Sequence, residues 1–164
     1  EPIHKDCKGC TLCIDACPTG ALSEYACDVE KCLDFNICHN KKYIPEEILA
    51  KTKHYLGENC PVYKEVCPAN AKLKPVEGKL PFDEVFPKLL PLLNLSDSEW
   101  EERYAATLYG FFITEKKYLQ RNAIIALGNL KNPEAIEPLE EILRSGDEEL
   151  KRYAAWSLDR IKNP

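Results

Sequence analysis

Apolar residues recur at helical spacing through the second half of the chain. The segment TEKKYLQRNAIIALGNL, residues 114–130, has apolar side chains three and four positions apart, at Tyr118, Leu119, Ala123, Ala126, Leu127 and Leu130. This period is typical of an amphipathic helix. Capping residues open three further segments, at Ser96, Asn132 and Asp147. The pattern therefore predicts that the second half is helical.

Two of these helices carry a related phrase. RNAIIALG begins at Arg121 and RYAAWSLD begins at Arg152, an offset of 152 − 121 = 31 residues. Small residues at fixed positions let paired helices pack closely, and stacked pairs bury what one pair leaves exposed. A third phrase, RYAATLYG at Arg103, falls outside this period. We predict a short HEAT-like array, with an ordinary helical bundle as the alternative.

The first part of the chain is distinguished by its cysteines, since all nine lie at or before Cys67. Four of them form the run CKGCTLCIDACPTG, residues 7–20, with the spacing Cys-x2-Cys-x2-Cys-x3-Cys-Pro. This is the bacterial-ferredoxin spacing, in which three cysteines bind one [4Fe–4S] cluster and the fourth binds another. A structural zinc site usually takes its ligands as two separated pairs. The run therefore predicts iron–sulfur clusters rather than zinc.

A second run should complete the pattern. CPVYKEVCPAN, residues 60–70, ends in Cys67-Pro68 and so mirrors Cys17-Pro18. A ferredoxin-type run would have cysteine at position 63, where this chain has Tyr63. Two [4Fe–4S] clusters need eight thiolates, and nine cysteines are present. We therefore predict two clusters, one of which takes a ligand from outside the two runs.

Composition separates two domains. From Ala71 the sequence AKLKPVEGKLPFDE is rich in Lys, Pro and Gly, as linkers are. The predicted fold is mainly α: a small α+β, bacterial-ferredoxin-like double [4Fe–4S] domain at residues 1–75, then an α–α HEAT-like repeat domain at residues 76–164. Short helices are expected in the first domain, one capped by Asp28 and one running from Pro45 to just before Gly57.

The whole chain has a formal charge of −5, with 45% hydrophobic and 30% charged residues. No apolar stretch approaches the ~20 residues of a membrane span, so we expect a cytoplasmic protein with no membrane partner. The chain has no Met and begins at Glu1, six residues before Cys7. We therefore expect it to be a piece of a longer protein.

The order of these parts resembles the epoxyqueuosine reductase family. The resemblance rests on CKGCTLCIDACPTGAL, DVEKCLDF, IPEEI, CPVYKEVCPAN, QRNAIIALGNLKNPEAI and RYAAWSLDRI. Such enzymes make the last step of queuosine, a modified tRNA base, and join a cobalamin-binding domain to a double [4Fe–4S] domain and a HEAT-like domain. The resemblance implies that this chain supplies electrons to a corrinoid in a domain outside it. No catalytic residue is expected in the chain itself.

The resemblance also implies the cluster ligands. The first cluster would be bound by Cys7, Cys10, Cys13 and Cys67. The second would be bound by Cys17, Cys32 and Cys60, and the family's fourth ligand falls on Tyr63. Cys38 is the favoured substitute, because the Asn and His residues around it indicate a bend, and Cys27 is the alternative.

A tRNA contact is expected in the segment that precedes the Arg-Asn pair. The basic residues available there are Lys116, Lys117 and Arg121. From residue 81 onward the chain has eleven basic and fifteen acidic residues, 11 − 15 = −4, whereas phosphate binding normally uses clustered positive charge. Weak tRNA binding is therefore expected. The alternatives are an iron–sulfur and HEAT protein that serves a different reductase, or a non-enzymatic dicluster carrier that docks a partner protein.

Overall fold

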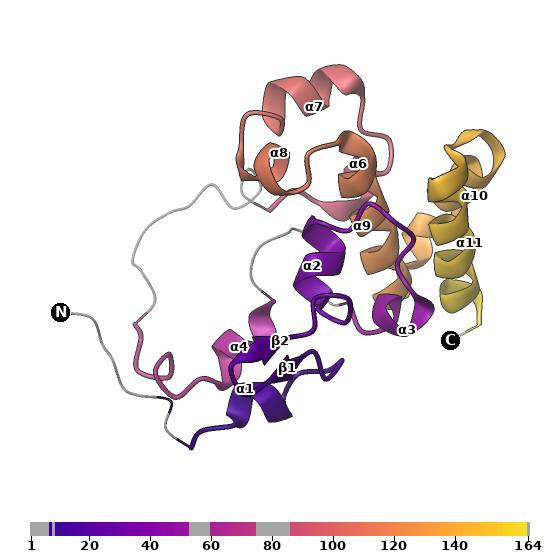
Figure 1. The fold of residues 1–164 in the computed structure, drawn as a ribbon. Coiled ribbons are helices and arrows are strands. Elements are labelled where there is room, and N and C mark those ends of the chain that lie inside the picture. The colour runs from indigo at the N-terminus through magenta and orange to yellow at the C-terminus, as the bar shows by residue number, and fades with distance from the viewer. Residues whose placement is uncertain (1–6, 8, 53–59, 75–85, 164) are drawn as a thin grey trace.

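The computed structural model describes residue 7 and residues 9–52, 60–74 and 86–163. Its first part contains short elements: α1 (Leu12–Asp15), β1 (Leu22–Ser23), β2 (Ala26–Cys27), α2 (Leu33–Cys38), α3 (Glu46–Leu49) and α4 (Pro61–Val66). Its second part is helical: α6 (Leu89–Leu92), α7 (Asp97–Arg103), α8 (Leu108–Phe112), α9 (Lys116–Asn129), α10 (Ile136–Ser145, after a 3-10 turn at Pro133–Ala135) and α11 (Glu148–Lys162). β1 and β2 form an antiparallel hairpin. The predicted mainly helical fold is confirmed (Figure 1).

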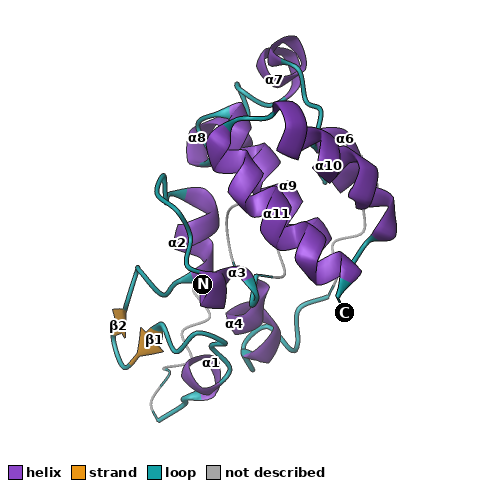
Figure 2. Ribbon diagram, turned by 90° about the vertical axis from the view of Figure 1, so that its right-hand side faces the viewer, coloured by secondary structure: helices purple, strands orange, loops and turns teal. Residues whose placement is uncertain are grey.

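The two longest helices, α9 and α11, pack along each other, and α10 packs against α11 (Figure 2). Gly128 sits at the closest approach, because a Cβ there would lie 2.5 Å from Ser157 Oγ and 2.8 Å from Ser157 Cα. Ser157 Oγ in turn donates a hydrogen bond to Ile124 O at 2.8 Å. Small residues thus allow close packing of the two repeated phrases, as the HEAT-like prediction requires.

The predicted helix starts are also confirmed. Ser96 and Glu99 form a reciprocal capping box at α7. The Asn132 side chain accepts from the backbone two residues later at 3.0 Å, and Asp147 accepts in the same way at 2.8 Å. The out-of-period phrase at Arg103 belongs to no repeat helix, because α7 ends at that residue and the chain turns before α8.

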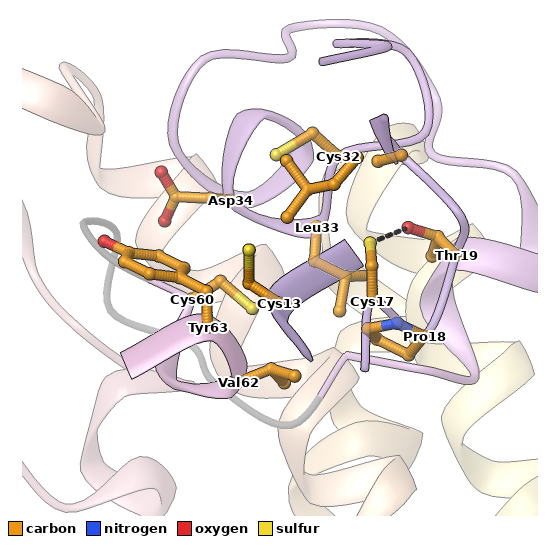
Figure 3. Close-up of a pocket in the computed structure, with 12 residues that line it drawn as sticks. Cys13, Cys17, Pro18, Thr19, Cys32, Leu33, Asp34, Cys60, Val62 and Tyr63 are labelled. Carbon is orange, nitrogen blue, oxygen red and sulfur yellow. Dashed lines mark hydrogen bonds between the residues drawn. The ribbon is translucent and has the colours of Figure 1, made fainter. Parts of the chain in front are cut away.

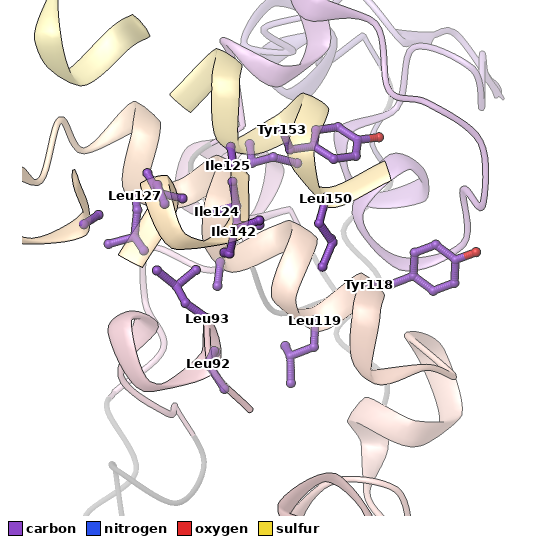
Figure 4. Packing of buried hydrophobic residues seen from close by; sticks show 14 of the residues in the cluster. Leu92, Leu93, Tyr118, Leu119, Ile124, Ile125, Leu127, Ile142, Leu150 and Tyr153 are labelled. Atoms are coloured by element: carbon purple, nitrogen blue, oxygen red, sulfur yellow. The ribbon is translucent and has the colours of Figure 1, made fainter. Parts of the chain in front are cut away.

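A single apolar core runs through α6, α9, α10 and α11 (Figure 4). It also includes five residues from α2, α3 and the loop between them, namely Leu33, Ile37, Ile44, Ile48 and Leu49. Tyr153 of α11 reinforces this connection, because its hydroxyl accepts a hydrogen bond from the Ile44 N–H at 3.0 Å. The middle of the cysteine-rich part is therefore packed into the helical part.

Two short helices differ from expectation. The helix after Pro45 ends at Leu49 instead of continuing toward Gly57. The Asn129 side chain accounts for this ending, since its amide donates to Leu49 O at 2.7 Å and to Thr52 O at 2.8 Å. The remainder of that predicted helix lies in residues 53–59, and most of the predicted linker lies in residues 75–85, all outside the described residues.

Asp28 does not cap α2 directly. Its Oδ1 accepts from Glu30 N at 3.2 Å and so closes a turn. Cys32 is the N-cap residue of α2, with extended backbone angles of φ −67° and ψ 123°. The capping signal was therefore one turn too early, and the true start of the helix places a cysteine at its N-terminus.

None of the helices in the described part of the chain combines the length and apolar composition that crossing a membrane requires.

Candidate metal centres

The first cysteine run begins with a tight turn. Gly9 adopts a φ of 73°, which glycine reaches without steric cost. This turn lets the Cys10 N–H donate to Cys7 O at 2.9 Å. Helix α1 follows immediately and carries Cys13. A cavity of about 360 Å³ is lined by Cys7, Cys10 and Cys13 together with residues of the β1–β2 hairpin.

A second cavity, of about 170 Å³, brings both cysteine runs together (Figure 3). Four cysteines line it: Cys13, Cys17, Cys32 and Cys60. Cys13 lies in α1 and Cys17 follows it, whereas Cys32 and Cys60 occupy the N-cap positions of α2 and α4. Most of the remaining lining is apolar, from Pro18, Ala21, Leu22, Leu33 and Val62. The cavity thus combines four thiols with a largely apolar wall.

The thiols of this cavity differ in their surroundings. Burial raises the pKa of Cys17, but hydrogen bonds from the Leu22 backbone and from Thr19 outweigh it, so that the pKa is lowered. The Thr19 hydroxyl lies 3.7 Å from Cys17 Sγ. Burial raises the pKa of the Cys60 thiol. Hydrogen bonds to sulfur and burial are also what tune iron–sulfur clusters.

The donor set fits a polynuclear cluster better than a single ion. Among the described residues, no three His, Cys, Asp or Glu side chains are close enough together to hold one metal ion. The second cavity has a volume of about 170 Å³. Thiolate sulfurs arranged around a space of this size match the ligand chemistry of a [4Fe–4S] cluster.

Two predicted ligands lie outside these cavities. Cys67 follows α4 in an extended conformation and is partly buried, but it lines neither cavity. Cys38 is 1% exposed in α2, and its Sγ lies 3.7 Å from Asp34 Oδ1. The structure therefore does not bring Cys38 to the cavity that contains Cys32.

Cys27 lies close to the cavity without lining it. It is exposed at the end of β2. Burial and the neighbouring Cys32 and Cys17 thiols raise its pKa, which places it beside the second-cluster cysteines. Of the two spare thiols, Cys27 is thus the one next to a predicted ligand.

Two side chains in the cavity were not expected as site residues. Asp34 lines it from the first turn of α2, and Tyr63 lines it from α4. Figure 3 shows them together on one side, away from Cys17 and Thr19. The sequence already showed that Tyr63 stands where the second run would have a cysteine. For Asp34, the available signal was its position two residues after Cys32, which places it in the lining of the cavity.

The predicted nucleic-acid residues do not share one exposed face. Arg121 is fully buried, and its guanidinium reaches the carbonyl groups at the end of α2. Lys116 forms an ion pair with Asp97 at 2.5 Å. Lys117 lies 3.6 Å from Glu149 Oε2. Only the two lysines remain accessible to a phosphate, and both already face carboxylates.

Comparison with known proteins assigns the cysteine-rich part and the helical part of the chain to two different families of domains. A model described as a 4Fe-4S double cluster binding domain matches residues 6–70, and one described as HEAT repeats matches residues 113–164. The chain therefore belongs to the class of iron–sulfur proteins that join a double-cluster module to HEAT repeats.

Full-length relatives identify the family more closely. Epoxyqueuosine reductase from Bacillus cereus is 36% identical over 98% of this chain and 43% of its own length. The solved epoxyqueuosine reductase from Streptococcus thermophilus superposes with a TM-score of 0.85 at 30% identity, covering 100% of this chain and 44% of that one. Another solved epoxyqueuosine reductase, with an epoxyqueuosine-modified tRNA-Tyr stem loop, gives a TM-score of 0.83 at 32% identity, over 99% of this chain and 44% of that one.

The chain belongs to the epoxyqueuosine reductase family. It spans less than half the length of the epoxyqueuosine reductases compared above.

Proposed function

We propose that this chain is the electron-transfer portion of an epoxyqueuosine-reductase-like oxidoreductase that acts in tRNA queuosine modification. The observation that carries the proposal is the cavity where cysteines from both runs meet, in a chain of this family. Bound [4Fe–4S] clusters supply one-electron chemistry. A role in tRNA modification would place the protein in the cytoplasm.

The ligands follow from the two runs. Cys7, Cys10 and Cys13 bind the first cluster, and Cys67 returns from the second run as the fourth ligand. Cys17, Cys32 and Cys60 bind the second cluster. Gly9 and the N-cap positions of α2 and α4 orient these thiols. Pro18 and Leu33 form part of the apolar wall of the second cavity.

The electron acceptor lies outside this chain. We propose a cobalamin held by another domain or subunit, since the family resemblance implies a corrinoid. We propose tRNA as the substrate, in line with the solved relative that carries a tRNA stem loop.

The first experiment is an anaerobic iron and sulfide determination on the reconstituted chain. We expect about eight of each per chain, the content of two [4Fe–4S] clusters. About four iron atoms, or stoichiometric zinc, would overturn the dicluster proposal.

One observation favours a second candidate, namely a related iron–sulfur and HEAT protein that relays electrons to a different reductase. The helical part has a net charge of 11 − 15 = −4 from residue 81 onward, and Lys116 and Lys117 both pair with carboxylates. Titration with modified tRNA distinguishes the candidates. Binding that depends on Lys116 and Lys117 supports the queuosine role, whereas its absence at ~50 mM salt supports the alternative.

A further inference from the structure

The second cavity has an oxygen-rich corner on the side away from Cys17. The carboxylate of Asp34 and the phenol of Tyr63 occupy one side of it (Figure 3). They come from α2 and α4, the same two helices whose N-cap residues are Cys32 and Cys60. Any cluster bound by those cysteines therefore has these oxygen atoms beside it.

The cysteines do not fill this corner. Cys13 lines both cavities, and the spacing of the first run assigns it to the cluster of Cys7 and Cys10. Cys38 is buried one helical turn beyond Asp34, outside the cavity lining. Cys27 lies beside Cys32 and also outside the lining.

We propose that Asp34 is the fourth ligand of the second cluster, so that one iron is held by a carboxylate in place of a thiolate. This inference rests on the proposed dicluster function. A carboxylate carries the same charge as a thiolate, but it is a harder ligand for iron. The iron at this corner is therefore bound less firmly than the other three.

The neighbours of Asp34 suit this role. Cys38 Sγ lies 3.7 Å from Asp34 Oδ1, as a thiol donor one turn further along α2. In this proposal Cys38 acts as a positioning residue for that carboxylate. Tyr63 covers the same corner from α4 and is 38% exposed, so that small oxidants reach the corner from solvent.

Controlled oxidation of the reconstituted chain tests the proposal. Ferricyanide takes one electron as the cluster loses its weakly held iron: [4Fe–4S]2+ becomes [3Fe–4S]+ with release of Fe2+. We expect the wild-type chain to release about one iron and to give about one [3Fe–4S] spin per chain by electron paramagnetic resonance. Asp34→Cys should suppress both, because it restores a thiolate ligand. The reconstituted Asp34→Asn chain should contain about seven iron atoms and should show the [3Fe–4S] signal before any oxidant is added.

Matched variants identify the fourth ligand if it is not Asp34. Asp97→Asn, in the first turn of α7, controls for loss of a carboxylate near a helix start. Cys27→Ser and Cys38→Ser test the spare thiols, and circular dichroism confirms that each variant is folded. Normal iron content and spectrum in Asp34→Asn, with loss in either serine variant, would overturn the inference but leave two clusters. Fewer than about eight iron atoms in a folded wild-type chain with no [3Fe–4S] signal would instead overturn the proposed function itself.

Discussion

Arg121 is the buried cation that joins the helical part to α2, and replacing it with methionine should destabilise the protein strongly. The guanidinium donates to three carbonyl oxygens at the end of α2: Asn40 O at 2.7 Å, Asn36 O at 3.1 Å and Ile37 O at 3.1 Å. These are carbonyl groups that the end of a helix leaves without a backbone donor. Methionine fills a similar volume but donates no hydrogen bond.

The magnitude follows from the acceptors that lose this donor, namely Asn36 O, Asn40 O and the Asn122 side-chain oxygen. The third carbonyl, Ile37 O, keeps a donor in the Asn122 amide at 3.1 Å. Each buried acceptor left without a donor costs ~1–3 kcal/mol. Entry of water and the apolar contacts of methionine recover part of that sum, so we expect a loss of about 3–5 kcal/mol in the free energy of unfolding. For a chain of this size that corresponds to a decrease in Tm of roughly 6–20 °C.

Urea unfolding followed by circular dichroism measures this difference. Arg144→Met is the matched control, because that side chain is 65% exposed on α10 and pairs with Glu141 at the surface. Its effect should stay within ~0.5 kcal/mol of wild type. Equal stabilities for the two variants would refute the buried-network argument. If the Arg121→Met protein were fully stable but bound tRNA more weakly, Arg121 would instead be a phosphate-binding residue.

Three further outcomes follow from the packing and charge. Gly128→Ala should destabilise the protein by up to about 2 kcal/mol in thermal unfolding, because a ~1 kcal/mol gain in helix propensity offsets only part of the ~1–3 kcal/mol overpacking cost against Ser157. A stabilised variant would contradict the close approach. Tyr153→Phe should cost about 1–3 kcal/mol, since it leaves the buried Ile44 N–H without an acceptor, and an unchanged urea midpoint would show that this hydrogen bond contributes nothing. Replacing Lys116 and Lys117 together with Ala should lower the salt dependence of any tRNA binding by about two phosphate contacts, and a steep, unchanged slope would place the contact elsewhere.

The helical half was predictable because its signals are local. Capping at Ser96, Asn132 and Asp147 depends on residues within one turn, and the period of α9 follows from its own sequence. The end of α3 was not predictable, because a hydrogen bond from Asn129, 80 residues away, determines it. Helix propensity is a weak prior against such tertiary contacts.

The candidate site shows the same division. Spacing alone was enough to group Cys7, Cys10 and Cys13, which line one cavity. The environment of Arg121 was not deducible, since a basic residue on a helix is normally exposed, and only the packing of α2 on α9 buries it. The presence of Asp34 in the cavity likewise depends on where α2 begins, one turn later than Asp28 suggested.

The continuous core has a consequence for engineering. The double-cluster match ends at residue 70, which invites grafting residues 6–70 onto another reductase as a self-contained electron module. Such a graft would expose Leu33, Ile37 and Ile48, which the helical part now covers, and contiguous exposed apolar patches promote aggregation. A transplantable unit would have to include α9 and α11, or replace that apolar face with polar residues. The cysteine-rich part and the helical part therefore depend on one shared apolar core.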